Sequence, residues 1–247
     1  MAGRSRLDVL LVQRGLAESR EKAQAIIMAG SVVVGERPAL KAGTLVAPGA
    51  DIRVLAGPQY VGRGGEKLAH ALDAFAVDVG GLTAVDVGAS TGGFTDCLLQ
   101  RGATRVYAVD VGRGQLDWRL RRDPRVVVME GVNARNLTPF LEKCDLATID
   151  VSFISLEKVL PAVVAVLREG ASIVALVKPQ FQARRQEVGK GGVVRDPQVH
   201  AAVLGRFIAW CAGHRLRLLG LTTSPLLGPA GNREFFVLLG IPAEAAS

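Results

Sequence analysis

The chain has 247 residues, of which 49% are hydrophobic, and a formal net charge of +7 at pH 7. This length and apolar content exclude a disordered chain and allow one large domain, or one domain with a small module beside it. The basic balance favours a polyanionic partner, and nucleic acid before a membrane surface.

Cysteine usage and hydropathy indicate the compartment. The three cysteines lie far apart without Cys-x-x-Cys spacing, which predicts neither a disulfide framework nor a zinc site. Asp8 interrupts the apolar run of residues 7–12, so no signal peptide is expected, and no run approaches the roughly eighteen apolar residues of a membrane span. We therefore expect a soluble, cytoplasmic protein without a metal and without stable membrane association, of unspecified oligomeric state.

The first 57 residues are expected to form a separate unit. Apolar residues recur at i, i+3 and i+4 spacing within residues 7–11 and 23–27, which predicts two short helices, the second capped by Ser19. Short strands are expected at residues 32–34 and 51–55. The basic side chains of this unit do not belong to the apolar faces of the helices. They therefore form either a solvent-exposed face or an RNA contact surface.

The motifs Arg6-Leu-Asp-x-Leu-Leu, Ser19-Arg20 and Gly30-x-Val32-x-Val34 decide between these alternatives. Their spacing resembles the RNA-binding domain of ribosomal small-subunit protein S4, and the resemblance covers about fifty residues. Such domains dock on folded RNA through phosphate and shape contacts. The resemblance therefore implies RNA contacts from Arg6, Arg14, Arg20 and Lys22.

Residues 58–62 have the composition of a linker. They precede Arg63-Gly-Gly-Glu-Lys67 and a helical pattern with Leu68, Leu72 and Phe75 on one face, which places Lys67 in the first turn of that helix. We therefore predict an S4-like domain at residues 1–57, a linker at residues 58–62 and a second domain at residues 63–247.

From residue 82 onward, apolar runs alternate with helical patterns. Strands are expected at residues 82–87, 105–109, 126–129, 146–149, 172–177, 216–222 and 234–239, and helices at residues 94–101, 156–167 and 197–213. Parallel strands that are buried on both faces show such continuous apolar runs. The pattern predicts an α/β fold, a Rossmann-like doubly wound sheet with one extra strand at its end, whose ligands bind beyond the carboxyl ends of the strands.

The stretch Asp86-Val-Gly-Ala-Ser-Thr-Gly-Gly-Phe-Thr-Asp96 is typical of a strand, a glycine turn and the start of a helix. Such a turn brings backbone N–H groups close to a ligand. Its spacing matches neither the dinucleotide fingerprint nor a phosphate loop, which favours S-adenosylmethionine, a nucleoside without phosphate, over NAD or ATP. An ordinary strand-to-helix turn is the alternative. The expected cofactor contacts in this stretch are Asp86, Gly88, Ser90, Gly92, Gly93 and Phe94.

Two residues further along the chain support this cofactor. Asp110 ends the next strand, where a carboxylate can accept hydrogen bonds from both ribose hydroxyls. Asn133 follows the third strand and can reach the adenine, although asparagine is also common in turns. Together with the glycine turn, these positions predict S-adenosylmethionine binding.

The fourth strand indicates the methyl acceptor. It ends Thr148-Ile-Asp150-Val-Ser-Phe153, without the Asn/Asp-Pro-Pro-Tyr/Phe sequence found where amino nitrogens are methylated. Carbon-5 methylation needs a cysteine nucleophile, and no Pro-Cys step occurs in a strand-end loop. A hydroxyl acceptor is therefore favoured, and such an oxygen must be oriented and relieved of its proton.

Two lysines and two carboxylates are expected to meet at the carboxyl edge of the sheet. Asp150 and Lys178 end two parallel strands, and Glu234 begins the last strand, which reaches the same edge if it runs antiparallel. Lys67 lies in the helix before the sheet. Crowding of this kind can lower a lysine pKa enough for proton acceptance, while a structural ion-pair network is the alternative.

Motifs along nearly the whole chain resemble the TlyA family: Arg63-Gly-Gly-Glu-Lys67, the stretch from Asp86 to Asp96, Asp150-Val-Ser-Phe-Ile-Ser-Leu156, Val177-Lys-Pro-Gln-Phe181, Gly189-Lys-Gly-Gly-Val-Val-Arg195 and Gly231-Asn-x-Glu234. The resemblance implies an FtsJ-like methyltransferase joined to the S4-like domain, with a catalytic tetrad at Lys67, Asp150, Lys178 and Glu234. It also implies methylation of cytidine 2′-hydroxyls in bacterial ribosomal RNA, free or in ribosomal subunits. Some family members are described as haemolysins, so a membrane-active protein is an alternative, as is a non-catalytic RNA-binding assembly factor.

Further RNA contacts are expected around this site, from Arg63, Arg184 and Lys190. Residues 184–195 are basic and rich in glycine, and we expect them to form a mobile loop that closes on RNA. Phe153 and Phe181 are the aromatic residues best placed for base stacking.

Overall fold

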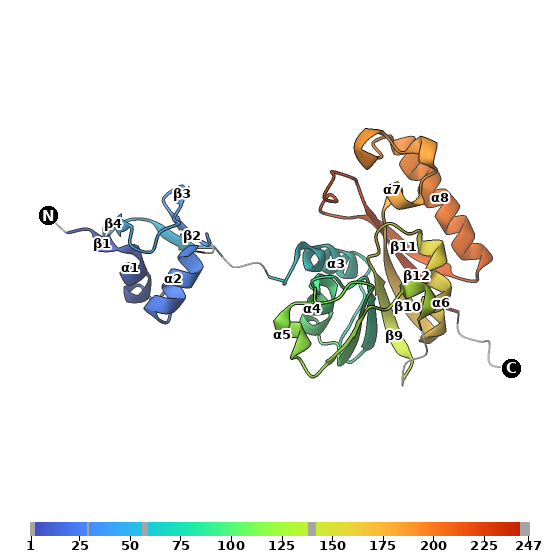
Figure 1. Cartoon of the computed structure of the whole chain (residues 1–247), viewed down its shortest axis with the longest axis horizontal. Helices are drawn as coiled ribbons and strands as arrows, with labels where there is room; N and C mark the ends of the chain where they lie inside the picture. Colours follow the sequence, from blue (N-terminus) through green and yellow to red (C-terminus); the bar gives the residue numbers. More distant parts are fainter. Residues whose placement is uncertain (1–2, 29, 56–58, 138–141, 243–247) are drawn as a thin grey trace. The chain divides into compact units, whose positions relative to one another are not determined.

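The computed structural model describes residues 3–28, 30–55, 59–137 and 142–242. The chain forms two compact units that divide between Gln59 and Tyr60 (Figure 1). The expected boundary between residues 57 and 58 lies outside the described residues. Tyr60, in the expected linker, is buried in the core of the second unit, and the Val61 N–H donates to the Asp96 carboxylate at 2.8 Å.

The first unit is a small α+β fold. Its apolar residues at i, i+3 and i+4 spacing form one core, in which Leu7 and Leu11 of the first helix meet Ala23 and Ile27 of the second. One antiparallel pair joins β1 to β4, and a three-stranded sheet has the order β3-β2-β5. The elements are β1 (Ser5–Arg6), α1 (Leu7–Gln13), α2 (Arg20–Met28), β2 (Val32–Val34), β3 (Arg37–Pro38), β4 (Leu45–Val46) and β5 (Ile52–Val54).

The second unit is built on one seven-stranded sheet of order β11-β12-β10-β9-β6-β7-β8. The five neighbouring strands from β10 to β8 are parallel, and β12 runs antiparallel to both β10 and β11. The predicted doubly wound sheet with an extra strand is therefore confirmed. Its strands are β6 (Thr83–Val87), β7 (Arg105–Asp110), β8 (Val126–Glu130), β9 (Cys144–Ile149), β10 (Leu167–Val177), β11 (Arg217–Thr223) and β12 (Phe235–Gly240).

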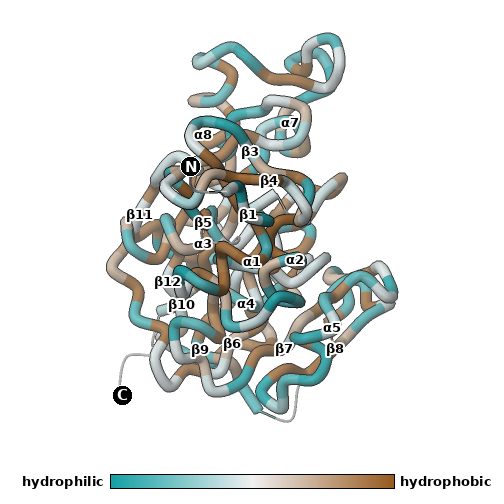
Figure 2. The backbone as a smooth tube through the Cα atoms, turned by 90° about the vertical axis from the view of Figure 1, so that its left-hand side faces the viewer, coloured by the Kyte–Doolittle hydropathy of each residue, from teal (hydrophilic) through white to brown (hydrophobic). Residues whose placement is uncertain are grey.

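Helices cover both faces of this sheet (Figure 1). Leu68 of α3 and Leu98 of α4 belong to the core on one face, and Val163 of α6 and Phe207 of α8 belong to the core on the other. Apolar residues, brown in Figure 2, run along β6, β7 and their neighbours, as two-sided burial requires. The helices are α3 (Arg63–Ala74), α4 (Gly93–Gln100), α5 (Trp118–Arg121), α6 (Leu160–Ala165), α7 (Pro179–Gln182) and α8 (Pro197–Gly213), with short 3-10 turns η1 (Ala134–Asn136), η2 (Leu156–Lys158), η3 (Arg185–Glu187) and η4 (Lys190–Gly192).

Two local expectations differ from the structure. The helix expected at residues 156–167 is broken into η2 and α6, because Pro161 fits the first turn of a helix but not its interior. β10 then begins at Leu167, five residues early, and its pairing with β9 shifts register near Gly170, whose φ is +72°. Lys67 lies one turn deeper in α3 than expected, since that helix already begins at Arg63.

Candidate active site

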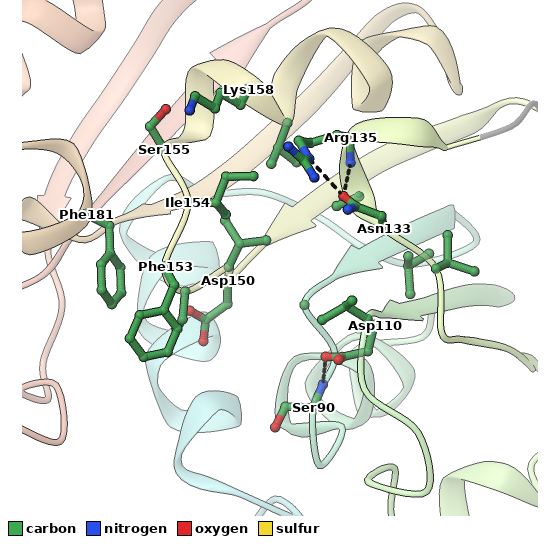
Figure 3. A pocket seen from close by; sticks show the side chains of 18 of the residues that line it. Ser90, Asp110, Asn133, Arg135, Asp150, Phe153, Ile154, Ser155, Lys158 and Phe181 are labelled. Carbon is green, nitrogen blue, oxygen red and sulfur yellow. Dashed lines mark hydrogen bonds between the residues drawn. The ribbon is translucent and has the colours of Figure 1, made fainter.

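A cavity of about 950 Å³ opens beyond the carboxyl ends of β6, β7, β8 and β9 (Figure 3). Each of these strands contributes a lining residue at its end or within the next three positions: Gly88, Asp110, Asn133 and Asp150. Its volume lies at the upper end of the ~300–1,000 Å³ typical of small-molecule sites. The cavity has room for a nucleoside cofactor and for part of a second molecule.

The glycine turn after β6 forms one wall of the cavity. Gly88 has φ of +89°, and a Cβ at this position would lie 2.5 Å from the Asp150 carbonyl oxygen, so the close approach of the β6 and β9 ends requires glycine. Ser90 follows with φ of +49°, and its N–H donates to the Asp110 carboxylate at 2.8 Å. The turn and the end of β7 therefore form one rigid wall.

Asp110 presents a carboxylate that is only partly satisfied by the protein. Its Oδ2 accepts the Ser90 N–H and its Oδ1 accepts the Gly112 N–H at 2.7 Å. A carboxylate has about four acceptor sites, so two remain for hydroxyl groups in the cavity. Across the cavity, Asn133 Oδ1 accepts from the Arg135 backbone N–H at 3.1 Å and from its guanidinium, which leaves the Asn133 Nδ2 donor for a ligand.

Asp86 lies below the cavity and does not line it. It is fully buried, and its carboxylate accepts hydrogen bonds from the hydroxyls of Thr95 at 2.7 Å and Thr148 at 3.1 Å. Burial raises the pKa of Asp86 to about 7 despite these two donors. In this structure Asp86 therefore ties β6 to α4 and β9.

The other predicted turn residues lie where two helices begin. Gly92, with φ of +97°, caps α4, and a Cβ on Gly93 would lie 2.9 Å from the Gly65 nitrogen of α3. Phe94 packs 6.1 Å from the Phe236 ring, measured between ring centroids. These three residues frame the glycine turn from behind, outside the lining of the cavity.

The four predicted catalytic side chains form two ion pairs. Lys178 Nζ lies 2.6 Å from Asp150 Oδ1, with side chains 11% and 22% exposed, and it also donates to the Ser152 hydroxyl at 2.9 Å. Asp150 lines the cavity (Figure 3), so Lys178 contacts a residue of the cavity wall. The Lys178 ammonium is therefore held in place by a carboxylate and a hydroxyl.

The second pair is deeper. Lys67 Nζ lies 2.6 Å from Glu234 Oε2, with side chains only 9% and 1% exposed, so water is largely excluded from this contact. Val177 and Phe235 are the last registered partners of β10 and β12, and Lys178 and Glu234 are the next residues toward the same edge. The antiparallel course of β12 thus brings Lys178 and Glu234, and with them both ion pairs, to one edge of the sheet.

Several cavity residues carried no motif and were missed from sequence. Glu130 accepts the N–H groups of Gly114 at 2.9 Å and Gln115 at 3.2 Å and also binds Arg121, and this loop presents Gln115 to the cavity. The guanidinium lowers the pKa of Glu130 to about 2. Arg135 and Lys158 line the opposite side. Val151, Ser152, Ile154 and Ser155 also line the cavity, and their place inside the motif from Asp150 to Leu156 was the signal that could have identified them.

The aromatic candidates lie together at the mouth of the cavity. The rings of Phe153 and Phe181 are 5.0 Å apart, and Phe153 is 90% exposed with φ of +62°. A bulky residue in the left-handed region is uncommon, and the strain that it carries is often found at functional sites.

The predicted RNA-binding residues of the first unit are partly engaged within it. Arg6 and Arg20 both bind the buried Asp8, at 3.0 and 3.1 Å, and Arg14 donates to the carbonyls of Ala50, at 2.8 Å, and Pro48. Lys22 is exposed. In the second unit, the predicted RNA-binding residues Arg63, Arg184 and Lys190 are all exposed.

Comparison with known proteins identifies the family. The model of FtsJ-like methyltransferases matches residues 60–241, and that of S4 domains matches residues 5–52. The 16S/23S rRNA (cytidine-2′-O)-methyltransferase TlyA of Mycobacterium tuberculosis is 47% identical over 250 residues, covering 100% of this chain and 93% of the relative. This chain belongs to the TlyA family of FtsJ-like methyltransferases.

Two further relatives extend the similarity. A candidate rRNA methyltransferase of Bacillus subtilis, YqxC, is 51% identical over 245 residues, or 98% of this chain and 87% of the relative. A solved structure of a candidate hemolysin from Streptococcus thermophilus superposes with a TM-score of 0.75 at 43% identity, covering 98% of this chain and 90% of that one. Within the described ranges, no helix of this TlyA-family chain has the length and apolar character needed to cross a membrane.

Proposed function

We propose that this protein uses S-adenosylmethionine to methylate ribose 2′-hydroxyls of cytidines in bacterial ribosomal RNA. The observation that carries the proposal is the pair of lysine–carboxylate contacts, Lys178 with Asp150 and Lys67 with Glu234, at the sheet edge beside the Asp110 cavity. The printed names of the relatives in Mycobacterium tuberculosis and Bacillus subtilis support the substrate. Ribosomal RNA as substrate corresponds to a reaction in the cytoplasm.

The cavity residues fit this cofactor. Asp110 has acceptor sites free for two ribose hydroxyls, Asn133 has an amide donor for the adenine, and Gly88 and Ser90 bring backbone close to the ligand. When bound, S-adenosylmethionine supplies a methyl group on a positively charged sulfur. Asp86, Gly92, Gly93 and Phe94 would hold the turn in place behind it.

The chain's own part in the reaction is to orient the acceptor oxygen and manage its proton. Lys178 would act as the main proton acceptor or as the steering group for the 2′-oxygen, while Asp150 and Ser152 fix its amine in place. Lys67 and Glu234 would form a second pair of opposite charges on the other side of the acceptor oxygen. No metal is assigned a role.

RNA would be brought to this site by the S4-like domain. We propose that residues 1–57 form the RNA-binding domain, residues 58–62 the linker and residues 63–247 the catalytic domain. The matches at residues 5–52 and 60–241 support the two domains, although the second match begins inside the proposed linker. The proposed RNA contacts are Arg6, Arg14, Arg20, Lys22, Arg63, Arg184 and Lys190. Arg6 and Arg20 would contribute the outward side of guanidinium groups that also bind Asp8.

Transfer of labelled methyl groups to purified small and large ribosomal subunits tests the reaction. We expect Lys178→Ala to lower turnover by about 10²–10⁴-fold, the range for loss of a general acid or base, with cofactor affinity unchanged. Full turnover by this variant would exclude the assigned role. Mapping of 2′-O-methyl sites in the product then identifies the nucleotide and the subunit.

Calorimetry with S-adenosylmethionine tests the cofactor separately. Asp110→Asn keeps the shape of the side chain but loses its charge and one acceptor group, so we expect affinity to fall by about 10–100-fold. Asp117→Asn is a matched control, because Asp117 caps α5 nearby and does not line the cavity. Equal affinity of both variants and the wild type would refute the assignment of Asp110.

A further inference from the structure

Residues 184–195, expected to form a mobile loop, are tethered to the second unit at several points. Near their start, Glu187 accepts the Arg184 N–H at 2.7 Å and forms an ion pair with Arg206 of α8 at 2.8 Å. Near their end, the Val194 carbonyl oxygen lies 3.0 Å from Nε2 of His200, which is buried against Phe235. We call residues 189–195 the glycine loop.

Asn232 supplies the contact that joins the glycine loop to the turn before β12. Its side chain is buried, with 2% of the residue exposed. One end of its amide accepts a hydrogen bond from the glycine loop, and the other end donates one to it. Oδ1 accepts the Val194 N–H at 2.9 Å, and Nδ2 donates to the Gly192 carbonyl oxygen at 3.0 Å. Only an amide of this length can accept and donate in this way, because a carboxylate has no donor and a hydroxyl is too short.

The same turn holds the catalytic glutamate. The Asn232 carbonyl accepts the Gly228 N–H at 2.9 Å, and a Cβ on Gly228 would lie 2.5 Å from Glu234 Oε1. Glu234 follows Asn232 by two residues and binds Lys67. Asn232 therefore belongs to both structures: its side chain binds the glycine loop, and its backbone carbonyl belongs to the turn that leads to Glu234.

The glycine loop exposes cations and buries its apolar residues. Val193 and Val194 are buried, whereas Lys190 and Arg195 are exposed and form no ion pair within the part of the chain that the structure describes. Arg233, on the turn itself, is exposed in the same way. These cations have no carboxylate partner, and the backbone that carries them is held in place. They can therefore bind the phosphates of an RNA strand, whose negative charges are regularly spaced.

We propose that Asn232 is a positioning residue for the RNA substrate, which holds the glycine loop as a fixed basic rim beside Glu234. The inference rests on the proposed function, since it concerns the same site and the same RNA. It assigns to a buried amide, rather than to closure of a mobile lid, the placement of Lys190 and Arg195 against RNA phosphates.

Asn232→Asp tests the proposal with almost no change of shape. The carboxylate still accepts the Val194 N–H but loses the bond to Gly192 and brings two acceptors together. We expect trypsin to cleave faster after Lys190, and the affinity for purified ribosomal subunits to fall by about tenfold, with S-adenosylmethionine affinity unchanged.

Gln186→Glu is the matched control for charge. Gln186 lies in the same segment, is exposed, and makes no side-chain hydrogen bond among the described residues. It adds the same negative charge near the RNA without releasing the loop, so cleavage after Lys190 should match the wild type. An equal loss of subunit affinity in both variants would overturn the proposal, as would faster cleavage of Asn232→Asp with unchanged affinity.

His200→Phe provides a second variant if Asn232→Asp does not fold. It keeps the ring contact with Phe235 and removes only the bond to the Val194 carbonyl oxygen, so it should give the same two effects at smaller size. Faster cleavage after Lys190 with unchanged subunit affinity would then overturn the proposal, because release of the loop would not affect RNA binding. Subunit affinity is measured without turnover. If the wild-type protein binds ribosomal subunits but transfers no methyl group, the proposed function is refuted while the inference on Asn232 is not.

Discussion

Asp8 in the first unit and Asp86 in the second are both fully buried, yet their carboxyl groups have opposite pKa shifts. Asp8 binds the guanidinium groups of Arg6 and Arg20 and the Gln24 amide, at 3.0 to 3.1 Å, and these donors hold its pKa well below the usual range. Asp86 accepts from the hydroxyls of Thr95 and Thr148 and from the Thr95 backbone, forms no ion pair among the described residues, and its burial raises its pKa to about 7.

The difference teaches that burial alone does not decide the charge of a carboxyl group. Two cations compensate the desolvation of Asp8, so it is ionised and organises the ends of α1 and α2. Hydroxyl donors compensate only part of the desolvation of Asp86, which is therefore near its protonation midpoint at neutral pH. The two units should consequently respond to pH in opposite directions.

The largest expected effect is the pH dependence of Asp86→Asn. The raised pKa means that the native state binds the Asp86 proton more tightly than the unfolded state, so this residue costs stability progressively between about pH 4 and pH 7. Asparagine removes that cost, and the stability of the variant relative to wild type should rise by up to about 4 kcal/mol across this window.

Urea unfolding followed by tryptophan fluorescence checks this prediction. Both tryptophans, Trp118 and Trp210, lie in the second unit, so the signal reports on that unit alone. Asp78→Asn is a suitable control, because Asp78 is exposed and binds only a neighbouring backbone N–H. Stability profiles of wild type and Asp86→Asn that stay parallel from pH 4 to pH 8 would contradict the raised pKa.

Asp8→Ala should give the next largest effect. It leaves two guanidinium groups and an amide without their shared acceptor, and because both arginines are about half exposed, water recovers part of the loss. We expect the free energy of unfolding of the first unit to fall by about 2–4 kcal/mol. Amide hydrogen exchange of residues 7–13 measures it, since this unit contains no tryptophan or tyrosine.

The control for Asp8 is Asp51→Ala in the same unit. Asp51 pairs with Arg53 at 3.5 Å, with side chains 65% and 61% exposed, so its loss should cost less than about 0.5 kcal/mol. In wild type, the contribution of Asp8 should persist above pH 4 and disappear as pH falls through its lowered pKa. Equal exchange rates in the two variants would show that the buried Asp8 network stabilises the first unit no more than the exposed Asp51 pair does.

The smallest effects separate structure from RNA contact in the S4-like domain. Arg20→Gln removes one of two cations from Asp8 and should cost about 1 kcal/mol of stability, whereas Lys22→Gln should cost almost nothing. If both residues bind phosphate, each variant lowers affinity for ribosomal RNA and reduces the slope of its salt dependence by about 1. Affinity that is lost only with Arg20→Gln would assign Arg20 a structural role and remove Lys22 from the RNA surface.

Local patterns of the sequence were sufficient for most of the architecture. Continuous apolar runs predicted every strand of the large sheet, all within two residues except the start of β10, which lies five residues earlier, and the residue range of α8 is the predicted one. The helix expected at residues 156–167 failed, because Pro161 acts at a helix start and the apolar pattern did not show where that start lies. Asp8 had been read only as an interruption of an apolar run, since nothing local indicates that two arginines will surround it.

The sequence by itself determined the family, the doubly wound fold and the residue types at the site, because motifs and periodicity are local properties of the chain. The tertiary structure decided which lysine binds which carboxylate, that Asp86 lies below the cavity while Asp110 faces it, and that Asn232 holds the glycine loop. These contacts join residues 28 to 167 positions apart in the chain, and only the folded sheet brings such groups to hydrogen-bond distance.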